Sequence, residues 1–130
     1  LSYTTFSISA PKPSKYTWNG KGSLQVETTV TNTGNMAGTE TVQLYIRDKF
    51  STVTRPVLEL KAYDKIYLQP GESKKVTFSL TAEAFAYYNI EMKYLAEKGD
   101  FIIYTGNSSA AKSLKKATIN LTQNIYFDEK

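Results

Sequence analysis

Apolar and polar side chains alternate in short runs along most of this chain. The clearest run is VQLYIRD at residues 42–48, in which Val42, Leu44 and Ile46 share one parity. Successive side chains of a strand point to opposite faces of a sheet, so a period of two predicts a half-buried β-strand. The preceding residues 31–38, TNTGNMAG, are small, polar and marked by glycine, which predicts a corner leading into that strand.

Comparable runs predict seven or eight short strands in total. A change of phase within residues 58–68 predicts a β-bulge, and QPGE at residues 69–72 predicts a tight turn. Residues 88–94 alternate as one continuous strand would, and Ile125 and Phe127 extend the pattern of the last strand. The residues expected in the core are Val26, Val30, Val42, Leu44, Ile46, Val76, Phe78, Leu80, Phe101 and Ile103.

Few segments predict anything other than strand. PKPSKYTWNGKG at residues 11–22 predicts a loop, and TAEAFA at residues 81–86 predicts a single helical turn with Thr81 as the N-cap acceptor. Short strands with frequent turn signals and almost no helix predict an all-β fold, an immunoglobulin-like antiparallel β-sandwich.

The chain has 130 residues, of which 41% are hydrophobic and 22% charged, as in ordinary folded domains. This length predicts one domain, residues 1–130, in which residues 1–9 form the connection and first strand. Residues 114–130 are expected to form the last strand and a C-terminal tail. No apolar run approaches the roughly 20 residues of a membrane-spanning helix, so no membrane partner is expected.

The formal net charge of +4 is spread along the whole sequence. Nucleic-acid binding would require the basic residues to gather into a patch, so no nucleic-acid partner is expected. The chain has no cysteine and no histidine, which excludes disulfides, thiolate catalysis, histidine-based triads and the usual zinc ligands. No cofactor is expected.

Asp48 and Glu59 flank an irregular stretch and are the candidate acid–base pair. Glycoside hydrolysis needs two carboxyl groups about 5–9.5 Å apart across a substrate cleft. Nothing in the sequence holds these two at such a distance, and we interpret them as a turn carboxylate and a salt-bridge partner for Arg47 or Arg55. Catalysis by this chain alone is therefore not expected.

Aromatic residues are plentiful, with ten Tyr, six Phe and one Trp. Tyr63 and Tyr67 share a strand face, and Tyr16 and Trp18 lie in a glycine-flanked loop, so stacking of sugars on exposed rings is one hypothesis. The favoured interpretation is that the rings are buried and the hydroxyls contact water, and carbohydrate binding by this domain is not expected. A covered domain interface would also use amphipathic rings of this kind.

Several longer motifs occur together, and they are LSYTTF at residues 1–6, TNTGNMAGTETVQLYIRD at 31–48, RPVLELKAYDKIYLQPGES at 55–73, FAYYN at 85–89, GDF at 99–101 and GNSS at 106–109. Through these motifs the chain resembles the C-terminal fibronectin type III-like domain of glycoside hydrolase family 3 enzymes, the β-glucosidases and β-xylosidases. It departs from the family pattern at Ala62 and Tyr63, where the family usually has Gly-Phe, and at Tyr94, near which the family often has tryptophan.

The resemblance implies a fibronectin type III-like sandwich without catalytic residues. In that family the nucleophilic aspartate lies on a (β/α)₈ barrel domain and the general-acid glutamate on an α/β sandwich domain, both upstream. These two domains are the implied packing partners, in a parent enzyme that removes terminal β-linked glucose or xylose from oligosaccharides in an extracellular or periplasmic location. The candidate interdomain contact residues are Leu1, Tyr3, Phe6, Phe50, Val53, Arg55 and Val57.

Two other hypotheses remain open from the sequence. The chain could be an independent carbohydrate-binding or adhesion sandwich, which binding of soluble glucans by the isolated chain would favour. It could also be a small stand-alone enzyme, which turnover of an aryl glycoside would be needed to support.

Overall fold

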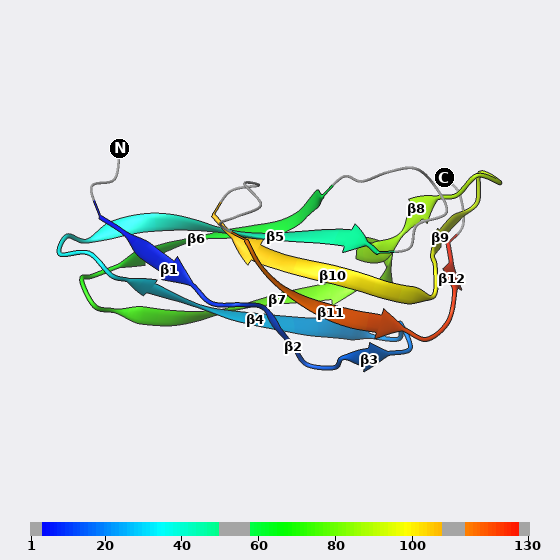
Figure 1. Ribbon diagram of the computed structural model, residues 1–130, viewed down its shortest axis with the longest axis horizontal. Coiled ribbons are helices and arrows are strands. Elements are labelled where there is room, and N and C mark those ends of the chain that lie inside the picture. The colour runs from blue at the N-terminus through cyan, green and yellow to red at the C-terminus, as the bar shows by residue number, and fades with distance from the viewer. Residues whose placement is uncertain (1–3, 50–57, 108–113, 128–130) are drawn as a thin grey trace.

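The chain folds into two packed β-sheets, which confirms the predicted fold class (Figure 1). The computed structural model describes residues 4–49, 58–107 and 114–127. The first sheet is built on β4, with β1 and β2 along one edge and β7 along the other. Its strands are β1 (Phe6–Ile8), β2 (Lys12–Pro13), β4 (Ser23–Asn32) and β7 (Ser73–Thr81).

The second sheet faces the first and has the order β3-β11-β10-β5-β6. Its pairs are antiparallel except β3 with β11, which is parallel. Its strands are β3 (Thr17–Trp18), β5 (Gly38–Asp48), β6 (Glu59–Leu68), β10 (Gly99–Gly106) and β11 (Lys115–Leu121).

A third, small sheet closes the end of the long axis opposite β1 (Figure 1). It has the order β12-β9-β8 and consists of β8 (Tyr87–Tyr88), β9 (Tyr94–Ala96) and β12 (Ile125–Tyr126). A 3₁₀ turn, η1 (Ala82–Phe85), joins β7 to β8. The described residues thus form twelve strands rather than the seven or eight predicted, because several pieces of two or three residues also pair.

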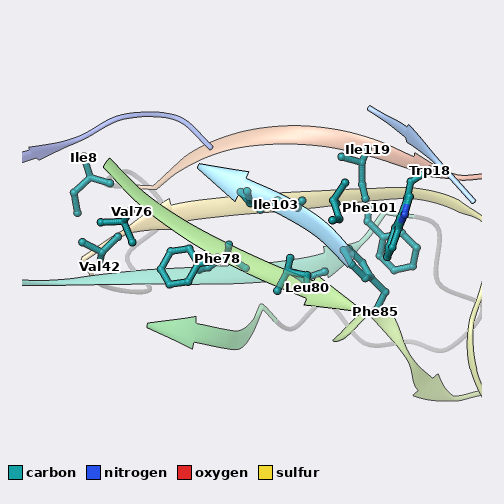
Figure 2. Close-up of a cluster of buried hydrophobic side chains, with 14 of the residues drawn as sticks. Ile8, Trp18, Val42, Val76, Phe78, Leu80, Phe85, Phe101, Ile103 and Ile119 are labelled. Carbon is teal, nitrogen blue, oxygen red and sulfur yellow. The ribbon is translucent and has the colours of Figure 1, made fainter. Parts of the chain in front are cut away.

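The core lies between the two large sheets and confirms the predicted parity of the strands (Figure 2). All ten residues expected in the core are buried, while Gln43 and Thr77, of the opposite parity, are half-buried and exposed. The rings of Trp18, Phe85 and Phe101 fill one end of this core, with edge-to-face contacts at centroid distances of 5.8 and 5.0 Å. Each fully buried large apolar side chain contributes about 1.5–3 kcal/mol, so the strand registers are strongly specified.

The bulge and the tight turn predicted in β6 and after it are both present. The pairing of β5 with β6 shifts register between Leu44 and Tyr45, opposite Lys61. In the turn, Gly71 has a φ of 80° and the Glu72 N–H donates to the Gln69 carbonyl at 3.0 Å. Glycine adopts this left-handed backbone at little cost, which explains its place in the turn.

The strand predicted over residues 88–94 is wrong, because the chain turns back on itself there. The Asn89 side chain accepts hydrogen bonds from the N–H groups of Glu91 and Lys93 at 2.9 and 3.0 Å. Met92 has a positive φ of 63°, which belongs to a turn rather than a strand. The result is a β8–β9 hairpin, with Tyr88 paired to Tyr94.

Three further expectations need correction. Ile125 begins a separate strand, β12, that pairs with β9 instead of extending β11. Residues 11–22 are not wholly a loop, because β2 and β3 pair with β4 and β11. Thr81 precedes η1, but its side chain makes no capping hydrogen bond.

Asn32, at the end of β4, fastens three segments of the chain together with a fully buried side chain. Its Nδ2 donates to the carbonyl oxygens of Met36 and Leu68 at 2.8 and 3.1 Å. Its Oδ1 accepts from Thr4 Oγ1 at 2.8 Å and from the Gly34 N–H at 3.0 Å. The corner between β4 and β5, the end of β6 and the segment that enters β1 therefore meet at one amide.

The same corner holds the entering segment by direct contact. A Cβ at Gly34 would overlap Thr4 Oγ1 and lie 2.9 Å from the Thr5 nitrogen, so only glycine fits without movement. The Thr33 N–H donates to the Thr5 carbonyl at 2.8 Å. The polar corner at residues 31–38 thus holds the segment that precedes β1 in place.

We expect Asn32→Ala to lower the free energy of unfolding by about 3 kcal/mol or more, because each buried polar group left without a partner costs about 1–3 kcal/mol. Urea denaturation of the chain measures this loss. Asn35→Ala, at an exposed position in the same corner, is the matched control and should change stability by no more than about 0.5 kcal/mol. Equal midpoints for the two variants would contradict the role of the Asn32 amide.

Candidate functional site

The structure describes one of the predicted interdomain contact residues, Phe6. It lies at the start of β1, half-buried, and packs against the core. The others, Leu1, Tyr3, Phe50, Val53, Arg55 and Val57, lie outside the described residues. The predicted contact surface is therefore neither confirmed nor contradicted by their positions.

A pocket of about 270 Å³ opens beside β1. Its lining residues are Phe6, Ser7, Ile8, Gly106, Asn107 and Lys115. The described lining residues include no carboxylate, and Asn107 Nδ2 donates to Glu40 Oε2 at 3.0 Å. The pocket therefore lacks the pair of carboxyl groups that glycoside hydrolysis requires.

Asp48 and Glu59 lie on the neighbouring strands β5 and β6. Glu59 is paired in register with Ile46 and forms an ion pair with Lys61 at 3.4 Å. Both carboxylates are half-buried in the sheet, and neither lines the described pocket. This placement supports a structural role for the two residues.

Neither a metal-binding cluster nor a membrane-spanning helix occurs in the described part of the chain. No cluster of three or more aspartate, glutamate, histidine or cysteine side chains that could hold a metal ion occurs among residues 4–49, 58–107 and 114–127. In these ranges no helix is both long and apolar enough to span a membrane. The two large sheets differ in the side chains that they carry on their outward faces.

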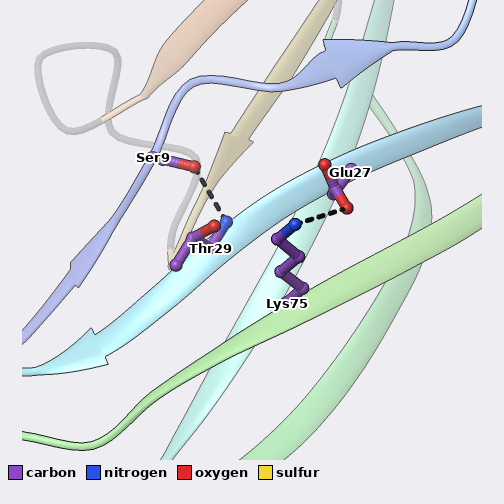
Figure 3. Close-up of polar contacts among 4 residues, drawn as sticks. All are labelled: Ser9, Glu27, Thr29 and Lys75. Carbon is purple, nitrogen blue, oxygen red and sulfur yellow. Dashed lines mark hydrogen bonds and ion pairs between the residues drawn. The ribbon is translucent and has the colours of Figure 1, made fainter.

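The outward face of the first sheet is polar on both of its long strands. Its outward residues are Gln25, Glu27, Thr29 and Thr31 on β4, and Ser73, Lys75, Thr77 and Ser79 on β7. Lys75 and Glu27 form an ion pair at 3.8 Å, and Ser9 Oγ accepts the Thr29 N–H at 2.8 Å (Figure 3). Two further side-chain pairs across β4 and β7 are hydrogen-bonded at 2.7 and 3.0 Å. These groups satisfy one another, so this face is suited to contact with water.

The outward face of the second sheet carries six aromatic or large apolar side chains, which we call the aromatic face. Its residues are Tyr45 of β5, Leu60, Tyr63 and Tyr67 of β6, and Ile102 and Tyr104 of β10. Tyr104 is paired with Tyr45, and Tyr45 with Leu60, so these three side chains form one row across the sheet. Tyr63, Tyr67 and Ile102 lie at other outward positions of the same strands, with Gln43, Arg47 and Lys65 among them. The face is therefore a mixture of aromatic and polar side chains over three strands.

Hydrogen bonds fix the centre of the aromatic face. Tyr45 Oη donates to Gln43 Oε1 at 2.8 Å, and Arg47 Nε donates to Tyr104 Oη at 3.2 Å. Tyr45 and Ile102 are buried although they point outward. They form a packed base, and the exposed apolar surface belongs mainly to the side chains of β6.

The favoured interpretation that the tyrosine rings are buried is wrong at the positions where it was made. Tyr63 and Tyr67 are 64% and 63% exposed, and Tyr16 is 57% exposed. Trp18 is buried, and its Nε1 donates to the Lys21 carbonyl at 3.1 Å. Strand parity correctly placed Tyr63 and Tyr67 on one face, but parity does not tell whether an outward face is covered.

A second aromatic group lies in the small sheet. The ring centroids of Tyr88 and Tyr94 are 4.8 Å apart, and those of Tyr94 and Phe127 are 5.7 Å apart. Burial raises the pKa of Tyr94 above its ordinary value of 10.0. The Glu83 carboxylate raises this pKa further, since it repels the phenolate and accepts a hydrogen bond from the neutral hydroxyl.

The chain is similar to a small part of each of several larger proteins. A family model described as a fibronectin type III-like domain matches residues 40–109. The chain is 44% identical over 127 residues to the thermostable β-glucosidase B of Acetivibrio thermocellus, covering 96% of this chain and 17% of that enzyme. It is 41% identical over 122 residues to a β-xylosidase of Formosa agariphila, covering 94% and 17%. The crystal structure of the β-glucosidase from Listeria innocua in complex with glucose matches with a TM-score of 0.84 and 36% identity, over 94% of this chain and 16% of that one.

We expect Glu83→Gln to lower the pKa of Tyr94 while leaving it above 10.0, because burial, the largest cause, remains. A raised pKa favours the folded state fully below pH 10.0, and this stability is lost as the pH rises through the folded-state pKa. Ultraviolet difference titration against Tyr94→Phe isolates the Tyr94 transition. Glu91→Gln, at an exposed position, is the control, and an identical transition in both glutamine variants would contradict the role of Glu83.

Proposed function

The chain belongs to the fibronectin type III-like domain family, and from this membership we propose that it is the non-catalytic, interdomain-packing domain of a glycoside hydrolase family 3 enzyme. The observation that carries the proposal is one of length. Nearly the whole chain, 94–96% of it, aligns with two β-glucosidases and a β-xylosidase. The aligned region is only 16–17% of the length of these three proteins. A domain of this kind occurs in those proteins beside a much larger remainder, and packing against that remainder is the proposed role.

The chemistry of the described residues supports a non-catalytic role. The pocket beside β1 has no carboxylate in its lining, and Asp48 and Glu59 are set in neighbouring strands rather than across a cleft. The polar outward face of β4 and β7 and the aromatic outward face of β5, β6 and β10 are surfaces, not substrate cavities. In this proposal the catalytic carboxylates lie outside these 130 residues.

The parent enzyme in this proposal removes terminal β-linked glucose or xylose from oligosaccharides. Support comes from the relatives, which are named as β-glucosidases and a β-xylosidase. The proposed neighbours are the barrel domain and the α/β sandwich domain that carry the nucleophile and the general acid in this enzyme family. The contribution of the present chain is to stabilise their arrangement.

The test is deletion of residues 1–130 from the parent enzyme. Contacts between domains bury about 600–1,500 Å², so the truncated enzyme should expose apolar surface and lose soluble yield. We expect its melting temperature to fall by about 5 °C or more and its turnover of an aryl glucoside or xyloside to decline. Thermal unfolding, yield and turnover are measured on the same preparations.

The parent enzyme carrying Asn35→Ala is the matched control, since it keeps the whole domain with an exposed substitution. It should match the wild type in all three measurements. A truncated enzyme as stable and as active as the wild type would refute the packing role. Binding of soluble glucans by the isolated chain would then support an independent carbohydrate-binding module.

A further inference from the structure

We propose that the aromatic face is the surface by which this domain docks on the remainder of its parent polypeptide. The inference rests on the proposed function and adds to it the identity of the docking face. Its starting point is the contrast between the two outward faces. The face on β4 and β7 consists of hydroxyl, amide and paired charged groups. The face on β5, β6 and β10 presents tyrosine, leucine and isoleucine, with Gln43, Arg47 and Lys65 among them.

Exposed apolar groups that adjoin one another on a sheet mark an interaction surface more strongly than scattered ones do. Leu60, Tyr45 and Tyr104 form one row across β6, β5 and β10. Tyr63 and Tyr67 lie further along the outward side of β6. Tyrosine is enriched in protein interfaces because its ring buries apolar area while its hydroxyl keeps a hydrogen-bond partner. The Tyr45 and Tyr104 side chains are already held by hydrogen bonds, so these two lose little side-chain entropy on docking.

The face also indicates the chemistry of its partner. Lys65 lies between Tyr63 and Tyr67 on the outward side of β6, and it forms no ion pair within the described residues. A mainly apolar surface that offers hydrogen-bond acceptors to the tyrosine hydroxyls and a carboxylate to Lys65 would complement it. This mixture of apolar and polar groups is typical of contacts between domains of one chain.

The remainder of the parent chain is the occupant that the comparisons favour. The sandwich spans only 14–17% of the length of its relatives, so in such a parent most of the polypeptide would be attached to this domain. Attachment gives the neighbour a high effective concentration, which a separate molecule lacks. A sugar ligand is less well supported, because the pocket of about 270 Å³ lies beside β1 and none of its lining residues belongs to the aromatic face.

The tip of the β8–β9 hairpin is the competing surface. Ile90 and Met92 are 73% and 67% exposed, more than any residue of the aromatic face. They occupy a single tight turn, however, and form no continuous row on a sheet. The hairpin therefore offers a small apolar tip, while the side chains of the aromatic face are spread over three neighbouring strands.

Nitration of tyrosines by tetranitromethane in the intact parent enzyme tests the proposal directly. Tyr63 and Tyr67 are 64% and 63% exposed in the domain, and Tyr16 and Tyr126, away from the face, are 57% and 61% exposed. The domain by itself thus predicts similar reactivity at all four positions. Docking through the aromatic face predicts nitration that is several-fold slower at Tyr63 and Tyr67 than at Tyr16 and Tyr126, followed by peptide mass spectrometry.

The other outcomes overturn the proposal and separate it from the proposed function. Equal nitration of all four tyrosines, together with a destabilising deletion of residues 1–130, would leave the packing role intact and refute this face. Slow nitration of Tyr126 alone would move docking to the small sheet. Protection of Tyr63 and Tyr67 that disappears on dilution would indicate a second copy, and protection that requires added oligosaccharide would indicate a sugar site.

A pair of matched double variants gives an independent measurement in the parent enzyme. Tyr63→Lys with Tyr67→Lys places two charges in the proposed contact, and Tyr16→Lys with Tyr126→Lys places two charges at equally exposed positions elsewhere. We expect the melting temperature to fall by about 3 °C or more in the first variant and to remain near the wild-type value in the second. Equal melting temperatures for the two double variants would refute docking through the aromatic face.

Discussion

The buried amide of Asn32 is the constraint on which the rest of the sandwich depends. An asparagine side chain has two N–H donors and an oxygen that accepts two hydrogen bonds, and here all four are used. The partners come from the segment entering β1, from the β4–β5 corner and from the end of β6. Because β4 belongs to one sheet and β5 and β6 to the other, this amide joins the two sheets where the chain crosses between them. An apolar residue could fill the space but would remove all four of these hydrogen bonds.

The opposite end of the sandwich is closed by aromatic packing instead. Trp18 enters from the short strand β3 and meets Phe85 from the 3₁₀ turn, which in turn meets Phe101 from β10 (Figure 2). The Trp18 ring is fully enclosed, and its one polar atom donates to a backbone carbonyl. The aliphatic side chains of the core therefore lie between the Asn32 hydrogen bonds at one end and the packed aromatic rings at the other. The inward side chains of the two large sheets are packed against one another. Binding to another surface therefore depends on the outward side chains.

The two outward faces follow from one rule applied to different sequences. Every second residue of a strand points outward, and the chain places serine, threonine and glutamine there on β4 and β7 but tyrosine and leucine on β6. The hydrogen-bonding groups of the first face pair with one another across the strands. On the second face the rings of Tyr63 and Tyr67 remain mostly exposed to water, so burying them against another surface is favourable. The asymmetry of the two faces is consistent with the proposed role of the domain as one part of a larger enzyme.

The sequence by itself determined the fold class, the core residues contributed by the long strands and the place of the bulge, because each depends on side-chain parity along a single strand. It did not place Trp18 and Phe85 in the core. It did not determine the hairpin at Asn89. The alternation of Tyr88, Ile90, Met92 and Tyr94 fits a continuous strand and also a hairpin with exposed residues at its turn. The Asn89 hydrogen bonds that favour the hairpin form only in the folded chain. Nor did it predict that Tyr63 and Tyr67 are exposed while Tyr45 is buried, since all three have outward parity. Parity assigns a side chain to one face of its strand, but the burial of that face is set by neighbouring strands that are distant in sequence, and only the tertiary structure brings them together.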